Sequence, residues 1–234
     1  MYKTEDMSFS SACFPFTFSE DRLLEEYKIC EGFAFSEHYN KADFAGSWKL
    51  IALRSMDGAT DTIGAFSPSG EFMNSPLLEK CEYFKEIIAK FECEKESIRL
   101  LNLCAGSKIH EHTDLELGYE DGVFRVHVPI TTNEDVRFYI NKELVTMDVG
   151  SCWYGNFNLP HAVENNGTSD RIHLVMDCKR NAWSDALFAK LGYDFEQENQ
   201  QIAYSEEEKQ RIVEELQRQG TEVSQELIEN ILKS

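Results

Sequence analysis

Three residues of the sequence have the types and the spacing of a mononuclear iron site. His112 and Asp114 are separated by one residue in the segment KIHEHTD, and His161 follows directly after Pro160 in a distant segment. On a β-strand alternate side chains share one face, so an imidazole and a carboxylate two positions apart can bind the same ion. Two histidines and one carboxylate leave positions open on Fe(II) for a bidentate 2-oxo acid and for O2. The spacing therefore predicts a facial triad of His112, Asp114 and His161.

An arginine and a further histidine follow at positions that suit a dicarboxylate cosubstrate. Arg171 lies on the predicted strand after His161. Because its planar guanidinium can bind a carboxylate through two hydrogen bonds, we expect it to bind the distal carboxylate of 2-oxoglutarate. His127, on a neighbouring predicted strand, could donate a hydrogen bond to the near carboxylate.

A second metal site can be drawn from the same segment. His110, His112, Glu116 and the distant His161 resemble the three-histidine, one-glutamate site of bicupins and germin-like proteins, in which Asp114 would be a bystander. The interval from Gly106 to His110 is shorter than that pattern uses, and the alternative gives Arg171 no task. The facial triad is therefore the preferred interpretation.

Composition limits the classes of partner. The chain has 234 residues and a formal net charge of −19, so a nucleic acid or an anionic membrane surface is not expected as a partner. No apolar run is long enough to span a membrane, and the N-terminus lacks the pattern of a secretory signal. The 7 cysteines are scattered, with no CxxC pair, which favours free thiols in a reducing cytoplasm.

The elements that must position these residues are mainly strands. Helical patterns cover 19–30 and 76–91, and 47–53 reads as a strand. Short β-branched or aromatic segments separated by turn signals then follow, which is typical of a jelly roll or barrel. They cover 97–106, 124–132, 136–142, 144–150, 151–157, 161–165 and 170–178. We therefore expect a mainly β fold with flanking helices: a double-stranded β-helix, or cupin-like jelly roll, plus C-terminal helices.

The predicted parts form one globular domain. Residues 1–95 supply N-terminal helices and strands that pack on the core, 96–180 form the double-stranded β-helix, and 181–234 form a helical extension. Gly220 divides the last helical block into a predicted hairpin. Its apolar stripes should pack on the barrel or on a second subunit, and the latter would give a homodimer.

Residues 97–180 resemble the aspartyl/asparaginyl β-hydroxylase family of Fe(II)- and 2-oxoglutarate-dependent oxygenases. The segments that carry the resemblance are RLLNLCAGSKIHEHTD, VFRVHVPITTN and GSCWYGNFNLPHAVENNGTSDRIHLVMD. They look nearest to small bacterial members, which include free-proline hydroxylases. The animal enzyme of this family lacks the carboxylate ligand, whereas Asp114 is present here.

The resemblance implies a set of site residues. His112, Asp114 and His161 would bind iron and so form the catalytic centre, while Arg171 and His127 would bind 2-oxoglutarate. Arg125 and Arg99 become candidates for a substrate carboxylate, and Trp153 and Asn156 for the lining of the substrate pocket.

The implied activity is hydroxylation, with O2, of an unactivated C–H bond in a small molecule, a free amino acid or a close derivative. Two alternatives stay open: a hydroxylase of a peptide- or carrier-bound residue, and a non-catalytic metal-binding domain of cupin type.

Overall fold

The computed structural model describes residues 9–62 and 71–202, with a few isolated positions further on. Its contacts divide the chain into two units, Met1–Leu191 and Gly192–Ser234. The first unit contains every strand and the helices α1 (Glu20–Glu31), α2 (Glu82–Ile88) and α3 (Ala182–Lys190), and the second contains α4 (Phe195–Ile202). Among the described residues, the helices are all too short or too polar to cross a membrane.

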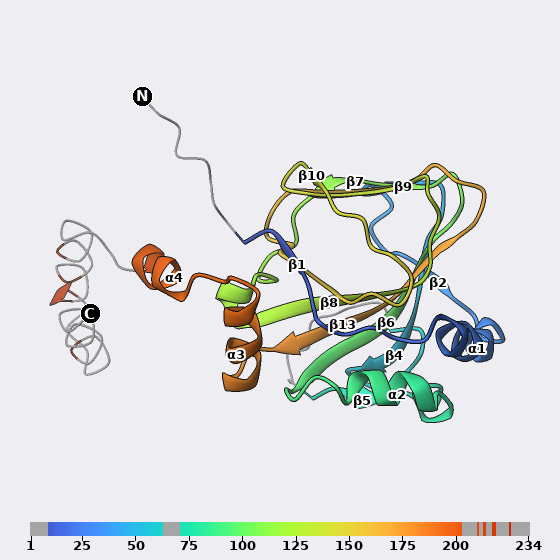
Figure 1. Cartoon of the computed structure of the whole chain (residues 1–234), viewed down its shortest axis with the longest axis horizontal. Coiled ribbons are helices and arrows are strands. Elements are labelled where there is room, and N and C mark those ends of the chain that lie inside the picture. Colours follow the sequence, from blue (N-terminus) through green and yellow to red (C-terminus); the bar gives the residue numbers. More distant parts are fainter. Residues whose placement is uncertain are drawn as a thin grey trace. The chain divides into compact units, whose positions relative to one another are not determined.

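Two antiparallel sheets face each other in the first unit (Figure 1). The larger sheet has the order β1-β11-β8-β13-β6-β4-β2, with β5 paired to β4, and the smaller has the order β10-β9-β12-β7-β3. The strands of the larger sheet are β1 (Ser11–Cys13), β2 (Ser36–Glu37), β4 (Trp48–Ser55), β5 (Met73–Asn74), β6 (Lys95–Leu103), β8 (Val123–Thr131), β11 (Trp153–Gly155) and β13 (Arg171–Lys179). Those of the smaller sheet are β3 (Phe44–Ala45), β7 (Lys108–His112), β9 (Val136–Ile140), β10 (Glu143–Leu144) and β12 (His161–Asn165). The prediction of a jelly-roll core with flanking helices is confirmed.

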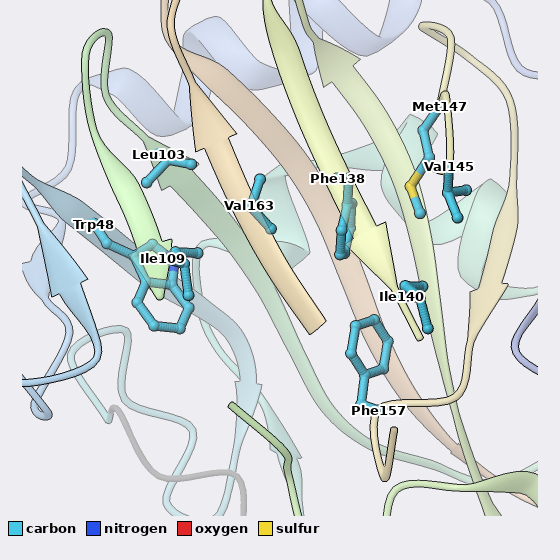
Figure 2. Packing of buried hydrophobic residues seen from close by; sticks show 9 residues of the cluster. All are labelled: Trp48, Leu103, Ile109, Phe138, Ile140, Val145, Met147, Phe157 and Val163. Carbon is cyan, nitrogen blue, oxygen red and sulfur yellow. The ribbon is translucent and has the colours of Figure 1, made fainter. Parts of the chain in front are cut away.

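The space between the sheets is filled by side chains from both. Buried residues of the smaller sheet, Ile109, Phe138, Ile140 and Val163, pack with Trp48 and Leu103 of the larger sheet and with Phe157 (Figure 2). Val145 and Met147, from the segment between β10 and β11, complete this cluster. Burial of such apolar surface is the main stabilising term of the fold.

One helix predicted from the sequence is confirmed, and a second needs correction. Ser19 caps α1 as expected, because its Oγ accepts a hydrogen bond from the backbone N–H of Arg22. The single helix predicted over 76–91 is wrong in its length. A short 3₁₀ turn (Leu78–Lys80) stops at Cys81, whose backbone is not helical, and α2 starts only after it.

Two further strand predictions need correction. Residues 144–150 form no regular strand, because pairing with β9 ends at Leu144 and the chain then turns across the barrel edge. The strand expected over 151–157 is limited to Trp153–Gly155. The predicted C-terminal hairpin, and with it the predicted dimer surface, lies outside the continuously described residues, and the three-part division of the chain stays a prediction.

Candidate active site

His112, Asp114 and His161 lie together at one end of the barrel. One ligand atom from each of the three lies within 4.8 Å of the other two. His112 is the last residue of β7, and His161, the first of β12, is its direct partner across the sheet. Asp114 comes from the loop after β7 and not from the strand itself, although the sequence argument relied on strand alternation. Its backbone N–H donates to the carbonyl oxygen of Phe157, which fixes the loop.

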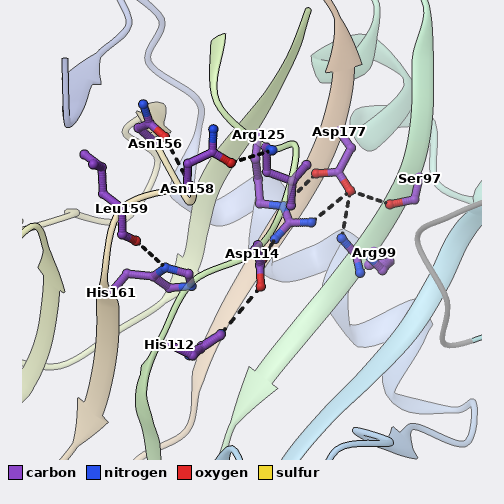
Figure 3. A network of polar contacts seen from close by, with 11 residues as sticks. Ser97, Arg99, His112, Asp114, Arg125, Asn156, Asn158, Leu159, His161 and Asp177 are labelled. Atoms are coloured by element: carbon purple, nitrogen blue, oxygen red, sulfur yellow. Dashed lines mark hydrogen bonds and ion pairs between the residues drawn. The ribbon is translucent and has the colours of Figure 1, made fainter. Parts of the chain in front are cut away.

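Backbone carbonyls orient both imidazoles. Nδ1 of His112 donates to the carbonyl oxygen of His110 at 2.8 Å, and Nδ1 of His161 donates to that of Leu159 at 3.0 Å. Each ring therefore has Nε2 as the nitrogen that faces the cluster, and such Nδ1 contacts are the usual outer support of a metal-bound histidine (Figure 3). Burial lowers the pKa of His161 to about 4, so its imidazole is neutral at pH 7.

An ion-pair network holds the carboxylate of Asp114. Arg125 donates from Nη1 to Asp114 at 2.8 Å, and from Nε and Nη2 to the two oxygens of Asp177 at 2.6 and 3.1 Å. Arg99 and Ser97 also donate to Asp177, at 2.9 and 2.8 Å (Figure 3). Burial alone would raise the pKa of Asp114, but the charge of Arg125 lowers it below the ordinary value.

Asp177 is the residue of this network that the sequence analysis missed. It lies opposite Arg125 in the register of β13 and β8, on the strand between those that carry the two arginines. Burial opposes its ionisation, yet Arg125 and Arg99 hold its pKa well below the usual range. The sequence did offer one signal for Asp177. It lies an even number of positions after Arg171 and His173 on the same strand, so its side chain should share their inward face.

Arg171 lies inside the barrel and has no carboxylate partner among the described residues. Its side chain is fully buried, its Nε has no hydrogen-bond partner there, and its Nη2 donates to Nδ1 of His173 at 2.9 Å. The guanidinium lies 5.2 Å from the ring centre of Phe138. Burial lowers its pKa to about 9, which still leaves it charged at pH 7. An uncompensated buried cation is costly, so this arrangement suits a site that receives an anion.

His127 completes a chain of polar groups that starts at Arg171. Because a guanidinium only donates, Nδ1 of His173 accepts, and Nδ1 of His127, 3.3 Å away, can only donate to it. Nε2 of His127 is then an acceptor, and it has no partner in the described structure. Donation from His127 to a cosubstrate carboxylate stays a prediction, and it would require the opposite tautomer.

Three cavities adjoin these residues. A central cavity of about 40 Å³ lies between the triad and Arg171 and is lined by Trp48, Leu101, Ile109, His112, Asp114, Arg125, His127, Phe138, Phe157, His161, Val163 and Arg171. A front cavity of about 650 Å³ opens beside the triad and is lined by His38, Tyr39, Asn40, Asp43, Trp48, Arg99, Leu101, His112, Thr113, Asp114, Leu115, Leu117 and Arg125. A rear cavity of about 430 Å³ reaches Arg171 from elsewhere and is lined by Thr132, Asn133, Glu134, Val136, Arg137, Phe138, Leu144, Val145, Thr146, Met147, Asp148, Arg171 and His173.

The other predicted site residues have partners of their own. The indole of Trp153 donates to Ser151 Oγ at 2.9 Å, and its ring packs against the apolar cluster. The Asn156 side chain donates to Glu120 and accepts from the backbone N–H of Asn158, so it shapes the turn that leads to His161. A substrate contact for either residue stays a prediction.

The N-terminal segment adds to the site His38, a residue that sequence reasoning did not select. His38 stacks on Trp48 with ring centres 3.8 Å apart, and both line the front cavity. Neither His38 Nδ1 nor Trp48 Nε1 has a hydrogen-bond partner in the described part of the chain. The segment HYNKADF has no periodic apolar pattern that could have identified His38 as a site residue.

Comparison with known proteins decides the family. The family described as Aspartyl/Asparaginyl beta-hydroxylase matches residues 21–181, which is well over half of the chain. The chain belongs to the aspartyl/asparaginyl β-hydroxylase family. The predicted family resemblance and the prediction of a hydroxylase are confirmed.

The chain is similar to several solved structures, and the first named here supports its fold. An oxidoreductase of the 2OG-Fe(II) oxygenase family from Burkholderia pseudomallei is similar with a TM-score of 0.51 at 12% identity, over 74% of this chain and 88% of that one. A prolyl-4-hydroxylase from Pseudomonas putida is similar with a TM-score of 0.47 at 9% identity, over 76% and 96%. HygX from Streptomyces hygroscopicus, solved with nickel and 2-oxoglutarate, has a TM-score of 0.49 at 11% identity, over 74% and 84%.

The buried carboxylate of Asp177 predicts an acid-sensitive fold for this protein. In Asp177→Asn two buried arginines lose their counter-charge, which should lower the free energy of unfolding by about 3–5 kcal/mol. Since the folded-state pKa of Asp177 is depressed, its contribution is present above about pH 4 and is lost as the pH falls further. Denaturant titrations from pH 3 to pH 7 should show a wild-type loss that the variant largely lacks.

The exposed Asp135 gives a matched control for this prediction. Asp135→Asn should follow the wild-type curve. Equal stability of Asp177→Asn and wild type at pH 7 would contradict a structural role for the Asp177 network.

Proposed function

We propose that this protein uses Fe(II), 2-oxoglutarate and O2 to hydroxylate an unactivated C–H bond of a free amino acid or a small derivative. The observation that carries the proposal is the convergence, on one narrow cavity, of the triad and of a buried arginine without a carboxylate partner among the described residues. A triad of this kind can bind several metals. The buried arginine indicates in addition that a dicarboxylate binds in the same cavity.

The donor set fits an iron ion held by His112, Asp114 and His161. Two neutral imidazoles and one carboxylate occupy one side of such an ion and leave positions for other ligands. Bound there, Fe(II) with 2-oxoglutarate would supply the activation of O2 that hydroxylation requires. The protein's share is to orient the ligands through His110 and Leu159 carbonyls and to hold Asp114 ionised with Arg125. No described side chain is needed as a general base.

Arg171 would bind the distal carboxylate of 2-oxoglutarate. Its Nε has no partner among the described residues and its guanidinium is buried, so a carboxylate there gains charge-assisted hydrogen bonds at little cost in new desolvation of the arginine. His127, which lines the central cavity together with Arg171 and the triad, would contact the other end of the same molecule.

The balance of charge at the front of the site favours a substrate with a carboxylate. If the charge of Asp114 is assigned to the metal, the group Arg99, Arg125 and Asp177 carries a net charge of one positive unit. Each nitrogen of the Arg125 guanidinium donates to one of the two aspartates, whereas Nε of Arg99 has no partner in the described structure. Arg99 is therefore the better candidate for the α-carboxylate of an amino acid, and Asp43 in the same cavity offers a carboxylate for its ammonium group.

Replacement of Arg99 tests the substrate class. In Arg99→Ala the KM for the amino-acid substrate should rise at least ten-fold, while succinate formed without substrate stays near the wild-type level. Arg99→Lys should recover part of the affinity. Arg125→Ala is a poorer test, because it also removes a partner of Asp114.

A succinate screen over the free amino acids separates the alternatives. Stimulation by one amino acid supports the proposal. Stimulation only by a peptide or a carrier-bound aminoacyl group would replace it with the peptide- or carrier-bound class. Metal binding without any turnover would indicate a non-catalytic domain. We further propose a reducing, cytoplasmic setting, because all seven cysteines are free thiols.

A further inference from the structure

The rear cavity and the front cavity share no lining residue. On the inner face of β13, Asp177 lies near the triad and Arg171 lies six positions earlier, about 20 Å along a strand. Thr131, where β8 ends, pairs with Ile172, so the residues after it line the rear cavity at the Arg171 end. The front cavity contains Asp114 and His112 at the other end. Arg171 can thus be approached from a side that the substrate does not occupy.

The central cavity is too small for the cosubstrate as it stands. Its volume of about 40 Å³ has room for only a few ordered waters, by the measure that one water needs about 10–15 Å³. The rear cavity is about ten times larger. Phe138 and Arg171 belong to the walls of both cavities, and their side chains contact each other. A shift of the Phe138 ring would therefore join the rear cavity to the place where the cosubstrate must lie.

The rear mouth has the features of a passage and not of a tight site. Figure 2 shows Val145 and Met147 beside Phe138 and Ile140, so one wall is apolar. The mouth also carries Glu134, Asp148 and Arg137, and Arg137 donates to the backbone carbonyls of Glu134 and Val136. These three side chains carry a net charge of one negative unit, which the charge of Arg171 offsets. The cation at the inner end, Arg171, supplies the attraction for an anion.

We propose that the rear cavity is the route by which the dicarboxylate cosubstrate reaches Arg171 and by which its dicarboxylate product leaves, with Phe138 as the movable wall. This inference rests on the proposed function. It separates the two ligands, because the amino acid uses the front cavity and 2-oxoglutarate the rear one. Cosubstrate exchange then continues while the substrate occupies the front cavity.

Bulky residues at the two mouths test the route. Thr146 and Leu115 are exposed and line the rear and front cavities, so Thr146→Trp and Leu115→Trp narrow one mouth each with little risk to folding. Anaerobic Fe(II) protein is mixed with 2-oxoglutarate, and the charge-transfer absorption of the complex gives association and dissociation rates. Leu144→Trp, at another exposed position of the rear mouth, repeats the test if Thr146→Trp does not fold.

A route and a binding contact predict different results. Thr146→Trp should slow both rates at least five-fold with Kd changed less than two-fold, since a passage affects both directions equally. Leu115→Trp should leave these rates unchanged and raise the KM of the substrate. Unchanged rates in both rear-mouth variants, or slow rates only in Leu115→Trp, would overturn the route. A raised Kd with faster dissociation would also overturn it. If the wild-type protein with Fe(II) gives no absorption change with 2-oxoglutarate, the proposed function itself fails.

Discussion

Asp114→Ala should bind Fe(II) at least about a hundred-fold more weakly than the wild type and should lose substrate oxidation. Loss of residues that only support a ligand typically costs 10–100-fold in metal affinity, so loss of the anionic ligand itself should cost more. His112→Ala and His161→Ala should behave in the same way. The measurement is anaerobic titration of the apoprotein with Fe(II) or Mn(II), followed by a turnover assay.

His110→Ala is the matched control for the metal site. The His110 side chain is exposed, and its backbone carbonyl, which orients His112, is kept in the variant. His110→Ala and Glu116→Ala should therefore bind metal normally. An active Asp114→Ala enzyme with an inactive His110→Ala enzyme would instead favour the three-histidine, one-glutamate site.

Replacement of Arg171 by the apolar Met should separate cosubstrate binding from stability. Loss of a charge-assisted carboxylate partner in a buried site costs about 2–5 kcal/mol, so the Kd for 2-oxoglutarate should rise by at least ten-fold while the metal still binds. The free protein should be as stable as the wild type or more stable, because an unpaired buried charge is removed. Isothermal titration with 2-oxoglutarate and thermal unfolding without it measure the two effects.

Arg137 serves as the control for this experiment, since it lies at the rear mouth and donates only to backbone carbonyls in the described structure. Arg137→Met should change the Kd for 2-oxoglutarate little. An Arg171→Met variant that binds 2-oxoglutarate normally, or one that unfolds several degrees earlier, would show that Arg171 is structural.

The amino-acid sequence by itself determined the strand-rich core, and it predicted the candidate metal ligands and a cation for the proposed cosubstrate. Residue type and short-range spacing are local properties, and alternation along a strand sets which residues share a face, as Arg125 and His127 do on β8. The PHAVEN and RIHLV segments carried the family resemblance that the comparison confirmed. The apolar stripe of 76–91 was likewise buried at Leu77, Phe84 and Ile87, although the helix itself is interrupted at Cys81.

Only the tertiary structure decided which charges meet. Asp177 lies far along the chain from Arg99 and Arg125, and it is the register of β13 between β6 and β8 that brings the three together. The same register leaves Arg171 without a carboxylate among the described residues, and the loop after β7, not strand alternation, brings Asp114 to the histidines. Such pairings depend on long-range packing and on the free energy of buried charges. Periodic patterns in the sequence report only local structure, so they do not reveal these pairings.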